Sequence, residues 1–552
     1  MLFTFCSRHQ TADIAILNGN ILTVENPVPF RGGIAIKDGL IIYVGTGKEI
    51  NHYIRKGTTK VIDAAGRLVI PGFNDAHIHF MPLDPDFVEL RYIADPGVIR
   101  EKVKARVLNS AKGQLIMGGH WDHELFADRQ WPSKELIDPV SPDNPVVIER
   151  VDGHSVLVNS VVLKASGINA GTPDPEGGEI VKDPVTHEPT GILKESAMAL
   201  IKYGDVKVQR SDAEEAERLH TGYLMAMEQA ARYGVTSVQI PGEADFKAYR
   251  ELLDNGLLTL RVDIGGKLTA DMDMLVKYDS LRKEYPKSGN WIRFGYLKGF
   301  MDGTLGSATA MMYEPFTDDP STSGLPQMSY ETLEQEVLRA DSMWFQIGIH
   351  AIGPKANTWI LNAYQKAQAV NGKRDSRHRS EHAQILIEKD LGRFAELGVI
   401  PSMQPTHCIT DKKYAEKRIG RERCRYAYAW KSLADNGARL AFGTDYPVEP
   451  LNPMEGIYAA VTRKDRKGEE GDGWFPEQKL SREKAIEYYT FGSAYAQFMD
   501  DRKGLLKKGY LADIVILDSD LLTIPEDSIM KTRVCYTITG GRIVFDSEKS
   551  DK

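Results

Sequence analysis

Short apolar runs recur along the middle of the chain and alternate with longer segments of helical pattern. Strands are expected at residues 235–240, 260–264, 292–298, 345–350, 380–385, 400–404 and 440–445, with one more directly before His77. Apolar runs of this length between helical segments are typical of βα units. A helix is expected over residues 212–233, with Ser211 as its N-cap. Eight such units predict an α/β fold, the (β/α)8 TIM barrel.

The two ends of the chain share a second pattern. Residues 12–17 resemble residues 512–517, and both ends also contain a glycine turn that precedes another apolar run. These turns are Asp38-Gly39 and Gly540-Gly541, which favour β-hairpins. We therefore expect a small β-sandwich built from residues 12–70 and 500–548, with residues 71–499 forming the barrel. Unrelated edge strands of different sheets are the alternative.

One connection is much longer than the others. About 155 residues separate His79 from Val235, whereas a βα loop normally has about 2–6 residues. The segment contains a strand pattern of its own at residues 144–150 and turn residues at 173–178. We expect residues 85–225 to form an inserted α/β subdomain over the mouth of the barrel.

Composition and charge narrow the class of protein. The chain has 552 residues and a net charge of −8, which argues against a nucleic-acid partner and is compatible with a small-molecule substrate. Its longest apolar runs fall short of the roughly 18 residues of a membrane span. Its four cysteines lack the spacing of a zinc site or a disulfide framework. We expect a cytoplasmic protein by default, with a trimmed N-terminal leader as the alternative. A homodimer is the default expectation for the oligomeric state.

Potential metal ligands stand at the carboxyl ends of five expected strands. In a TIM barrel these ends form the active-site face. The residues are His77 and His79, Lys298, His350, His382 and Asp445. Two histidines at i and i+2 of a strand point to the same face, so the rings of His77 and His79 can share an ion. Each residue alone has an ordinary structural explanation, but all six in barrel order are hard to attribute to chance.

These residues lie in stretches that resemble the amidohydrolase superfamily, in the branch called amidohydrolase family 3, which includes N-substituted formamide deformylase-like enzymes. The stretches are residues 71–79, 297–307, 349–353, 381–384 and 443–447. The insert is similar through residues 119–121 and 152–155 with Asn159, and the terminal region through residues 508–513. The resemblance extends across the whole chain. It identifies the family but gives almost no information about the substrate.

The resemblance implies a divalent metal, with Zn the first expectation and one or two ions per chain. His77, His79 and Asp445 would hold one ion, and His350 and His382 a second. Lys298 would bridge the two after carboxylation by carbon dioxide, because a protonated ammonium has no lone pair. Glu195 is a rival carboxylate for that position.

The implied reaction is hydrolysis of a non-peptide, amide-type C–N bond of the N-acyl or N-formyl amine class. A bound divalent ion lowers the pKa of water from 15.7 to roughly 7, which supplies hydroxide at neutral pH, and it polarises the scissile carbonyl. Asp445 would take the proton of that water and pass it to the departing amine. The alternatives are a deaminase of a cyclic amidine and a non-catalytic amidohydrolase-like scaffold. A scaffold is expected to have lost ligands, and this chain retains all six.

Four further residues are expected substrate contacts. His120, Trp121 and His154 lie in the insert, and His407 follows the strand at residues 400–404. Local packing is the alternative explanation for each. Asp302 is expected to cap a turn or to support Lys298.

Overall fold

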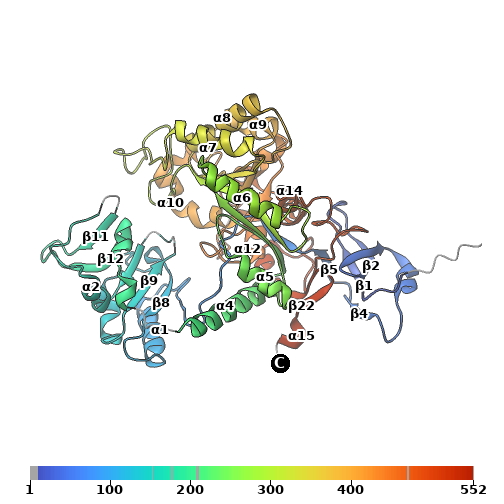
Figure 1. The fold of residues 1–552 in the computed structure, drawn as a ribbon, viewed down its shortest axis with the longest axis horizontal. Helices are drawn as coiled ribbons and strands as arrows, with labels where there is room; N and C mark the ends of the chain where they lie inside the picture. The colour runs from blue at the N-terminus through green and yellow to red at the C-terminus, as the bar shows by residue number, and fades with distance from the viewer. Residues whose placement is uncertain are drawn as a thin grey trace, which may run out of the picture. The chain divides into compact units, whose positions relative to one another are not determined.

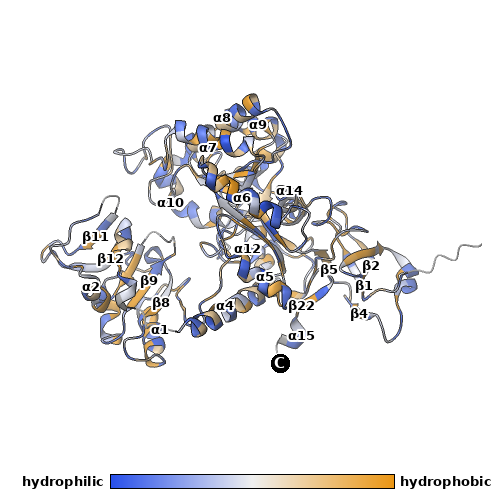
Figure 2. Cartoon of the chain, in the orientation of Figure 1, coloured by the Kyte–Doolittle hydropathy of each residue, from blue (hydrophilic) through white to orange (hydrophobic). Residues whose placement is uncertain are grey.

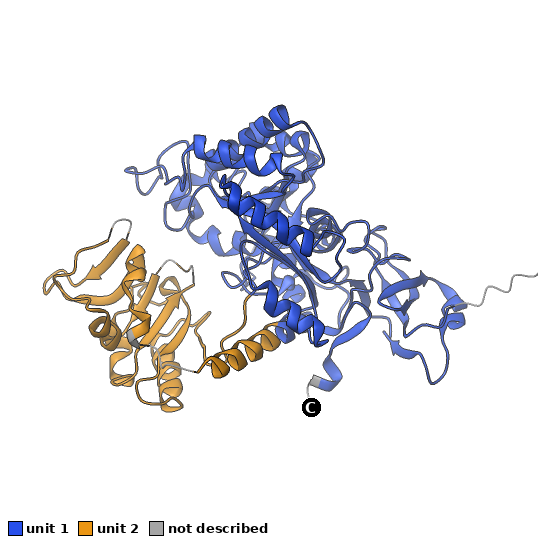
Figure 3. Ribbon diagram, viewed as in Figure 1, with its two compact units in different colours: residues 1–80, 227–552 blue, residues 81–226 orange. Residues whose placement is uncertain are grey.

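The computed structural model describes residues 10–151, 153, 155–175, 178–206, 211–468 and 471–550. The chain divides into two compact units (Figure 3). The first unit consists of residues 1–80 and 227–552, and the second of residues 81–226. Each unit is described by itself below.

The first unit contains a ring of eight parallel strands, as the spacing of the apolar runs predicted. The strands follow one another in the order of the sequence. They are β6 (Phe73–Asp75), β13 (Val235–Ile240), β14 (Arg261–Lys267), β15 (Ile292–Phe300), β16 (Ile347–Ala351), β17 (Arg379–His382), β18 (Ile400–Met403) and β19 (Ala441–Phe442). The Ala76 amide donates to the Phe442 carbonyl at 3.1 Å, which brings the two ends of the sheet together. The predicted TIM-barrel fold is confirmed.

Helices lie between and after these strands in the sequence, and most of them are labelled in Figure 1. They are α4 (Asp212–Arg232), α5 (Phe246–Asp254), α6 (Met272–Glu284), α7 (Tyr330–Ser342), α8 (Pro354–Asn371), α9 (Glu388–Leu397), α10 (Pro405–Arg423), α11 (Trp430–Asp435), α12 (Pro453–Thr462), α13 (Arg482–Glu487), α14 (Ser493–Ala496) and α15 (Ser547–Ser550). The expected N-cap is present, since the Glu214 amide donates to Ser211 Oγ at 3.3 Å and the Ser211 amide donates to Glu214 Oε2 at 2.8 Å. This reciprocal pair is a capping box, which fixes where α4 begins.

The strands of the two chain ends join in one eight-stranded sheet. The strands are β1 (Ile14–Ile21), β2 (Phe30–Lys37), β3 (Leu40–Gly45), β4 (Lys60–Asp63), β5 (Leu68–Pro71), β20 (Ile514–Leu517), β21 (Val534–Thr539) and β22 (Arg542–Asp546). Antiparallel pairing of β5 with β20 connects the two ends of the chain. The isoleucines of β1 and β2 are buried in the apolar core of this sheet, and Figure 2 shows apolar colouring on β2. The apolar residues 521–524, which follow the second of the two similar stretches, form a turn.

The hairpin turn at Asp38-Gly39 has the geometry that its sequence predicts. Asp38 has φ 50° and Gly39 has φ 78°, both in the left-handed region that a two-residue type I′ turn requires. This turn connects β2 to β3 directly and so sets the register of the edge of the sheet.

The second unit is a six-stranded mixed sheet with its own apolar cores. Its strands are β7 (Val88–Glu89), β8 (Ile116–Trp121), β9 (Val146–Arg150), β10 (Ser155–Val158), β11 (Gly178–Lys182) and β12 (Pro189–Glu195). Its helices are α1 (Pro96–Leu108), α2 (Ser160–Ser166) and α3 (Tyr203–Val206). The strand expected at residues 144–150 is β9. Across the described part of the chain, we find no helix with the length and apolar character needed to cross a membrane.

Candidate metal centre

All six predicted ligands lie at the carboxyl end of the barrel strands. Lys298 and His350 lie within β15 and β16, His382 is the last residue of β17, Asp445 follows β19, and His77 and His79 follow β6. The prediction that the two histidines lie inside a strand is wrong, because β6 ends at Asp75. Their convergence therefore needs another cause.

Buried hydrogen bonds to Asp75 hold the segment that contains the two histidines. Asp75 Oδ1 accepts the amides of His77 at 3.2 Å and Thr444 at 2.9 Å. The Asp445 amide donates to the His77 carbonyl at 2.8 Å, so the segment after β6 pairs with the segment after β19. These contacts, rather than strand alternation, bring His77 and His79 to Asp445.

Asp445 lies between two pairs of histidines. Its Oδ1 is 3.4 Å from His79 Nε2 and 3.6 Å from His77 Nε2. Its Oδ2 is 3.2 Å from His407 Nε2 and 4.0 Å from His382 Nδ1. In the described part of the chain, the groups whose ligand atoms converge tightly enough for an ion are His77, His79 and Asp445, and His382, His407 and Asp445.

A left-handed backbone turns His382 toward the site. Neighbouring residues of a regular strand point to opposite faces, so His382 and the adjacent Glu381 could not both reach one site. His382 has φ 74° and Ala383 has φ 43°, and Asp445 has φ 58°. Non-glycine residues in this region cost about 1–3 kcal/mol each and concentrate at functional sites. The strain thus falls on the residues that form the candidate centre.

Lys298 and His350 complete the buried cluster. Lys298 Nζ is 3.3 Å from His77 Nε2. The rings of His350 and His382 have centroids 4.5 Å apart. His350 Nε2 lies 3.1 Å from the Gly303 carbonyl, so it makes a hydrogen bond instead of facing Asp445. Lys298 and His350 are therefore adjacent to the convergent groups but not members of them.

A second layer of charge supports His77. Glu381 Oε2 lies 2.5 Å from His77 Nδ1, and both side chains are fully buried. Arg379 Nε lies 2.6 Å from Glu381 Oε1, and its other nitrogens donate to Gln239, Ser402 and the Ala76 carbonyl. A carboxylate on Nδ1 fixes the tautomer of a histidine and directs Nε2 to a metal.

Burial keeps His77, His350 and His382 neutral. It lowers the pKa of His77 to about 4 and of His350 to about 3, with the Lys298 charge adding to both, and it lowers the pKa of His382 well below its usual value. Burial also lowers the pKa of Lys298 to about 8 against the opposing charges of Glu381 and Asp445. Neutral imidazoles have the lone pair that a divalent ion needs.

His407 has the opposite charge state. Burial would lower its pKa, but the hydrogen bond and charge of Asp445 raise it to about 9. Burial likewise would raise the pKa of Asp445, yet His407 and the neighbouring histidines hold it well below the usual value. His407 is therefore protonated at neutral pH and cannot offer a lone pair until it loses that proton, whereas the neutral rings of His350 and His382 each already have one nitrogen lone pair.

The donor set fits a divalent cation. Asp445 Oδ1 is buried and has no hydrogen-bond partner among the described residues. A buried, ionised oxygen without a partner is costly. The Nε2 atoms of His79 and His77 lie 3.4 and 3.6 Å from this oxygen. Imidazole and carboxylate ligands of this kind suit Zn and neighbouring metals.

The insert residues that the sequence singled out belong to the second unit. His120 lies 2.8 Å from Glu89 Oε2 and has φ 70°. Trp121 is completely buried in the core of this unit and donates its indole N–H to the Ile148 carbonyl at 2.9 Å, which favours packing over the predicted substrate contact. His154 lies outside the described residues. The rival carboxylate Glu195 is exposed at the end of β12.

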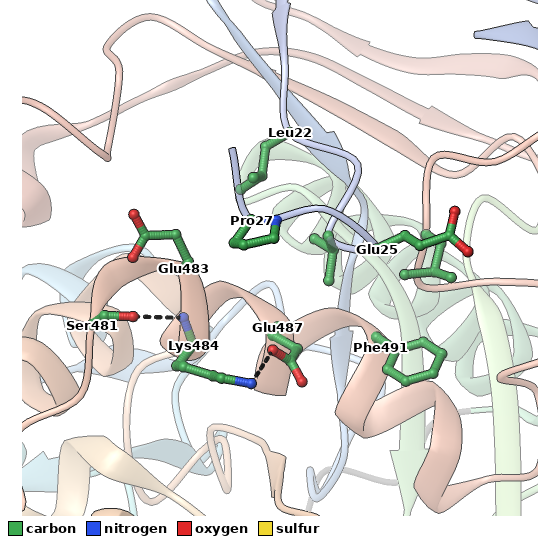
Figure 4. Close-up of a pocket in the computed structure, with 10 residues that line it drawn as sticks. Leu22, Glu25, Pro27, Ser481, Glu483, Lys484, Glu487 and Phe491 are labelled. Carbon is green, nitrogen blue, oxygen red and sulfur yellow. Dashed lines mark hydrogen bonds and ion pairs between the residues drawn. The ribbon is translucent and has the colours of Figure 1, made fainter. Parts of the chain in front are cut away.

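A separate cavity of about 510 Å³ lies between the loop that follows β1 and α13 (Figure 4). Leu22, Pro27 and Phe491 contribute apolar walls. Its charges pair locally, because Lys484 Nζ lies 2.8 Å from Glu487 and Lys507 Nζ lies 2.6 Å from Glu25. It contains none of the candidate ligands, so we place the functional site at the barrel strands.

Sequence reasoning missed the residues that support the ligands. Glu381 was visible beside His382, but its contact with His77 joins residues 304 positions apart. Asp302 accepts the amides of Met311, Ile352 and Gly353, so it joins the loops after β15 and β16 and does not contact Lys298 in any described hydrogen bond.

The chain is similar to known proteins over most of its length. The family model described as "Amidohydrolase family" matches residues 60–545. Protein LONG AFTER FAR-RED 3 of Arabidopsis thaliana is 34% identical over 527 residues, covering 92% of this chain and 88% of that protein. The N-substituted formamide deformylase of Arthrobacter pascens is 26% identical over 553 residues, covering 97% and 99%.

A solved structure shares the fold at similar identity. The crystal structure of an uncharacterized metal-dependent hydrolase from Pyrococcus furiosus matches with a TM-score of 0.70 and 29% identity. The match covers 92% of this chain and 100% of that one.

Proposed function

Because the chain belongs to the amidohydrolase family, we propose that this metal-dependent hydrolase cleaves a non-peptide, amide-type C–N bond, with N-acyl or N-formyl amines as the substrate class. The observation that supports the proposal best is the buried Asp445 Oδ1, which lacks a hydrogen-bond partner among the described residues and faces Nε2 of His77 and His79. The similarity to an N-substituted formamide deformylase favours the C–N bond.

His77, His79 and Asp445 would hold one divalent ion, and His350 and His382 would hold a second after His350 releases the Gly303 carbonyl. A bound divalent ion lowers the pKa of water and polarises a carbonyl group. The neutral His77, His350 and His382 need lose no proton to bind.

Lys298 is suited to the proposed carboxylation. The neutral amine attacks carbon dioxide, forming an N–C bond and releasing one proton, which leaves a carbamate. Burial lowers the pKa of Lys298 to about 8, so a fraction of the side chain is neutral at physiological pH. The carbamate would offer two oxygens where the ammonium has no lone pair.

Asp445 would move the proton. Its Oδ1 faces His77 and His79, which leaves Oδ2, beside His407, to accept a proton from the attacking water. Asp445 would then donate that proton to the amine nitrogen as the C–N bond breaks. The protonated His407 keeps Asp445 ionised until the proton arrives.

A substrate panel tests the proposal. We expect the metal-loaded protein to release amine and carboxylate from N-formyl or N-acyl amines, and to lose this activity after chelation. Amine release would be followed with an amine reagent, beside a dipeptide as the peptide-bond control. A deaminase would be supported if the protein released ammonia from cyclic amidines and released no amine from amides. A scaffold would be supported if the metal-loaded protein turned over neither class of compound.

A further inference from the structure

Phe300 is a large apolar residue that is exposed beside the candidate centre. It is the last residue of β15 and is 48% exposed, while the eight preceding residues of the strand are mostly buried. A partly exposed phenyl ring at the active-site face of a barrel offers an apolar surface to a ligand.

The strand geometry points this ring toward the reacting groups. Phe300 and Lys298 are two residues apart in β15, so their side chains leave the same face of the strand. Phe300 also pairs with His350 in the ladder between β15 and β16. The Phe300 ring centroid is 5.6 Å from the His350 ring centroid. Lys298 Nζ is 4.6 Å from the Phe300 ring centroid.

The backbone around Phe300 is held in place. The Met301 amide donates to the His350 carbonyl at 3.0 Å, and the Gln327 amide donates to the Met301 carbonyl at 2.9 Å. Further along the same loop, Arg418 of α10 donates to the Gly306 carbonyl at 2.7 Å. These bonds fix the backbone from which the Phe300 ring projects.

Phe300 and Asp445 belong to opposite sides of the barrel. β15 is the fourth strand of the ring and β19, which precedes Asp445, is the eighth. In the proposed function Asp445 donates its proton to the amine nitrogen, so the amine side of the substrate lies toward β19. The acyl side of the scissile bond then extends toward β15.

We propose that Phe300 binds the acyl substituent of the substrate, so that N-acyl amines with an apolar, ring-bearing acyl group are preferred. The inference rests on the proposed function, since the orientation follows from the proton transfer by Asp445. Packing of a ring on Phe300 is expected to add about two- to tenfold to affinity.

Binding of the acyl products tests this without turnover. Phenylacetate and acetate would be titrated calorimetrically into the full chain after metal soaking. We expect phenylacetate to bind about two- to tenfold tighter than acetate, and Phe300→Ala to remove this difference. The control is Trp344→Ala, which removes an aromatic residue that is 69% exposed and precedes β16, at the opposite end of the strand. The control should keep the preference.

Three results would overturn the inference. The first is a preference for phenylacetate over acetate that survives Phe300→Ala. The second is no such preference in the unsubstituted protein. The third is tighter phenylacetate binding in the variant, which would mean that the ring limits the size of the acyl group. Failure of the proposed function shows separately, as absence of amine release from every N-acyl amine by the metal-loaded protein.

Discussion

Replacing Asp445 by Asn is expected to lower kcat/KM for amide hydrolysis by about 10²–10⁴-fold. The amide of Asn cannot accept the proton of water or deliver it to the leaving amine. The substitution also removes the buried negative charge of Asp445, whose carboxylate oxygens lie 3.4 Å from His79 Nε2 and 3.2 Å from His407 Nε2. The measurement is kcat/KM of the purified variant, with circular dichroism to show that the barrel is folded.

A second buried aspartate provides the control. Asp390 is fully buried and pairs with Arg393 at 2.9 Å on α9. Asp390→Asn should change kcat/KM far less than Asp445→Asn. Near-normal turnover by folded Asp445→Asn would remove Asp445 from the proposed proton transfer.

Replacing Glu381 by Gln is expected to reduce both metal affinity and stability. Loss of the carboxylate on His77 Nδ1 should weaken metal binding about 10- to 100-fold. The buried Arg379 loses its ion pair, which should cost about 3–5 kcal/mol in the free energy of unfolding. Chelator competition measures the affinity, and urea denaturation of the metal-free protein measures the stability.

The stability difference should depend on pH. Burial would raise the pKa of Glu381, but Arg379 and His77 lower it to about 2. A depressed pKa stabilises the fold above the ordinary glutamate pKa of about 4.3. The difference between the unsubstituted protein and Glu381→Gln should therefore be constant near neutral pH and shrink as the pH falls from about 4 toward 2.

A matched variant separates the two effects. Asp513 makes a buried pair with Arg261 at 2.7 Å, between the terminal sheet and β14. Asp513→Asn should lower stability by a comparable amount and leave metal affinity unchanged. If both variants bound metal equally well, Glu381 would have only a structural role.

The periodicity of the sequence is sufficient to predict the barrel. Each expected strand is an apolar run such as Val235–Ile240, and all six of its residues are buried. Since the carboxyl ends of parallel strands meet at one face, residues that end those runs had to meet. The paired termini were also visible, because β1 and β20 share the same apolar pattern.

The finer geometry of the centre depends on contacts that periodicity does not encode. His382 reaches the site through a left-handed φ, and His77 through hydrogen bonds to Asp75 and Asp445 beyond the end of β6. Trp121 lies in a motif with His120, yet it is buried in the core of the second unit. Motif membership did not distinguish a packed residue from a ligand contact, because both leave the same sequence signal.

The metal-to-protein ratio tests the central claim most directly. It would be measured by elemental analysis of the purified chain, with bicarbonate present throughout to preserve a carbamate on Lys298. The two proposed ligand sets predict a ratio of about two. A ratio near zero that soaking with divalent metal could not raise would contradict the account.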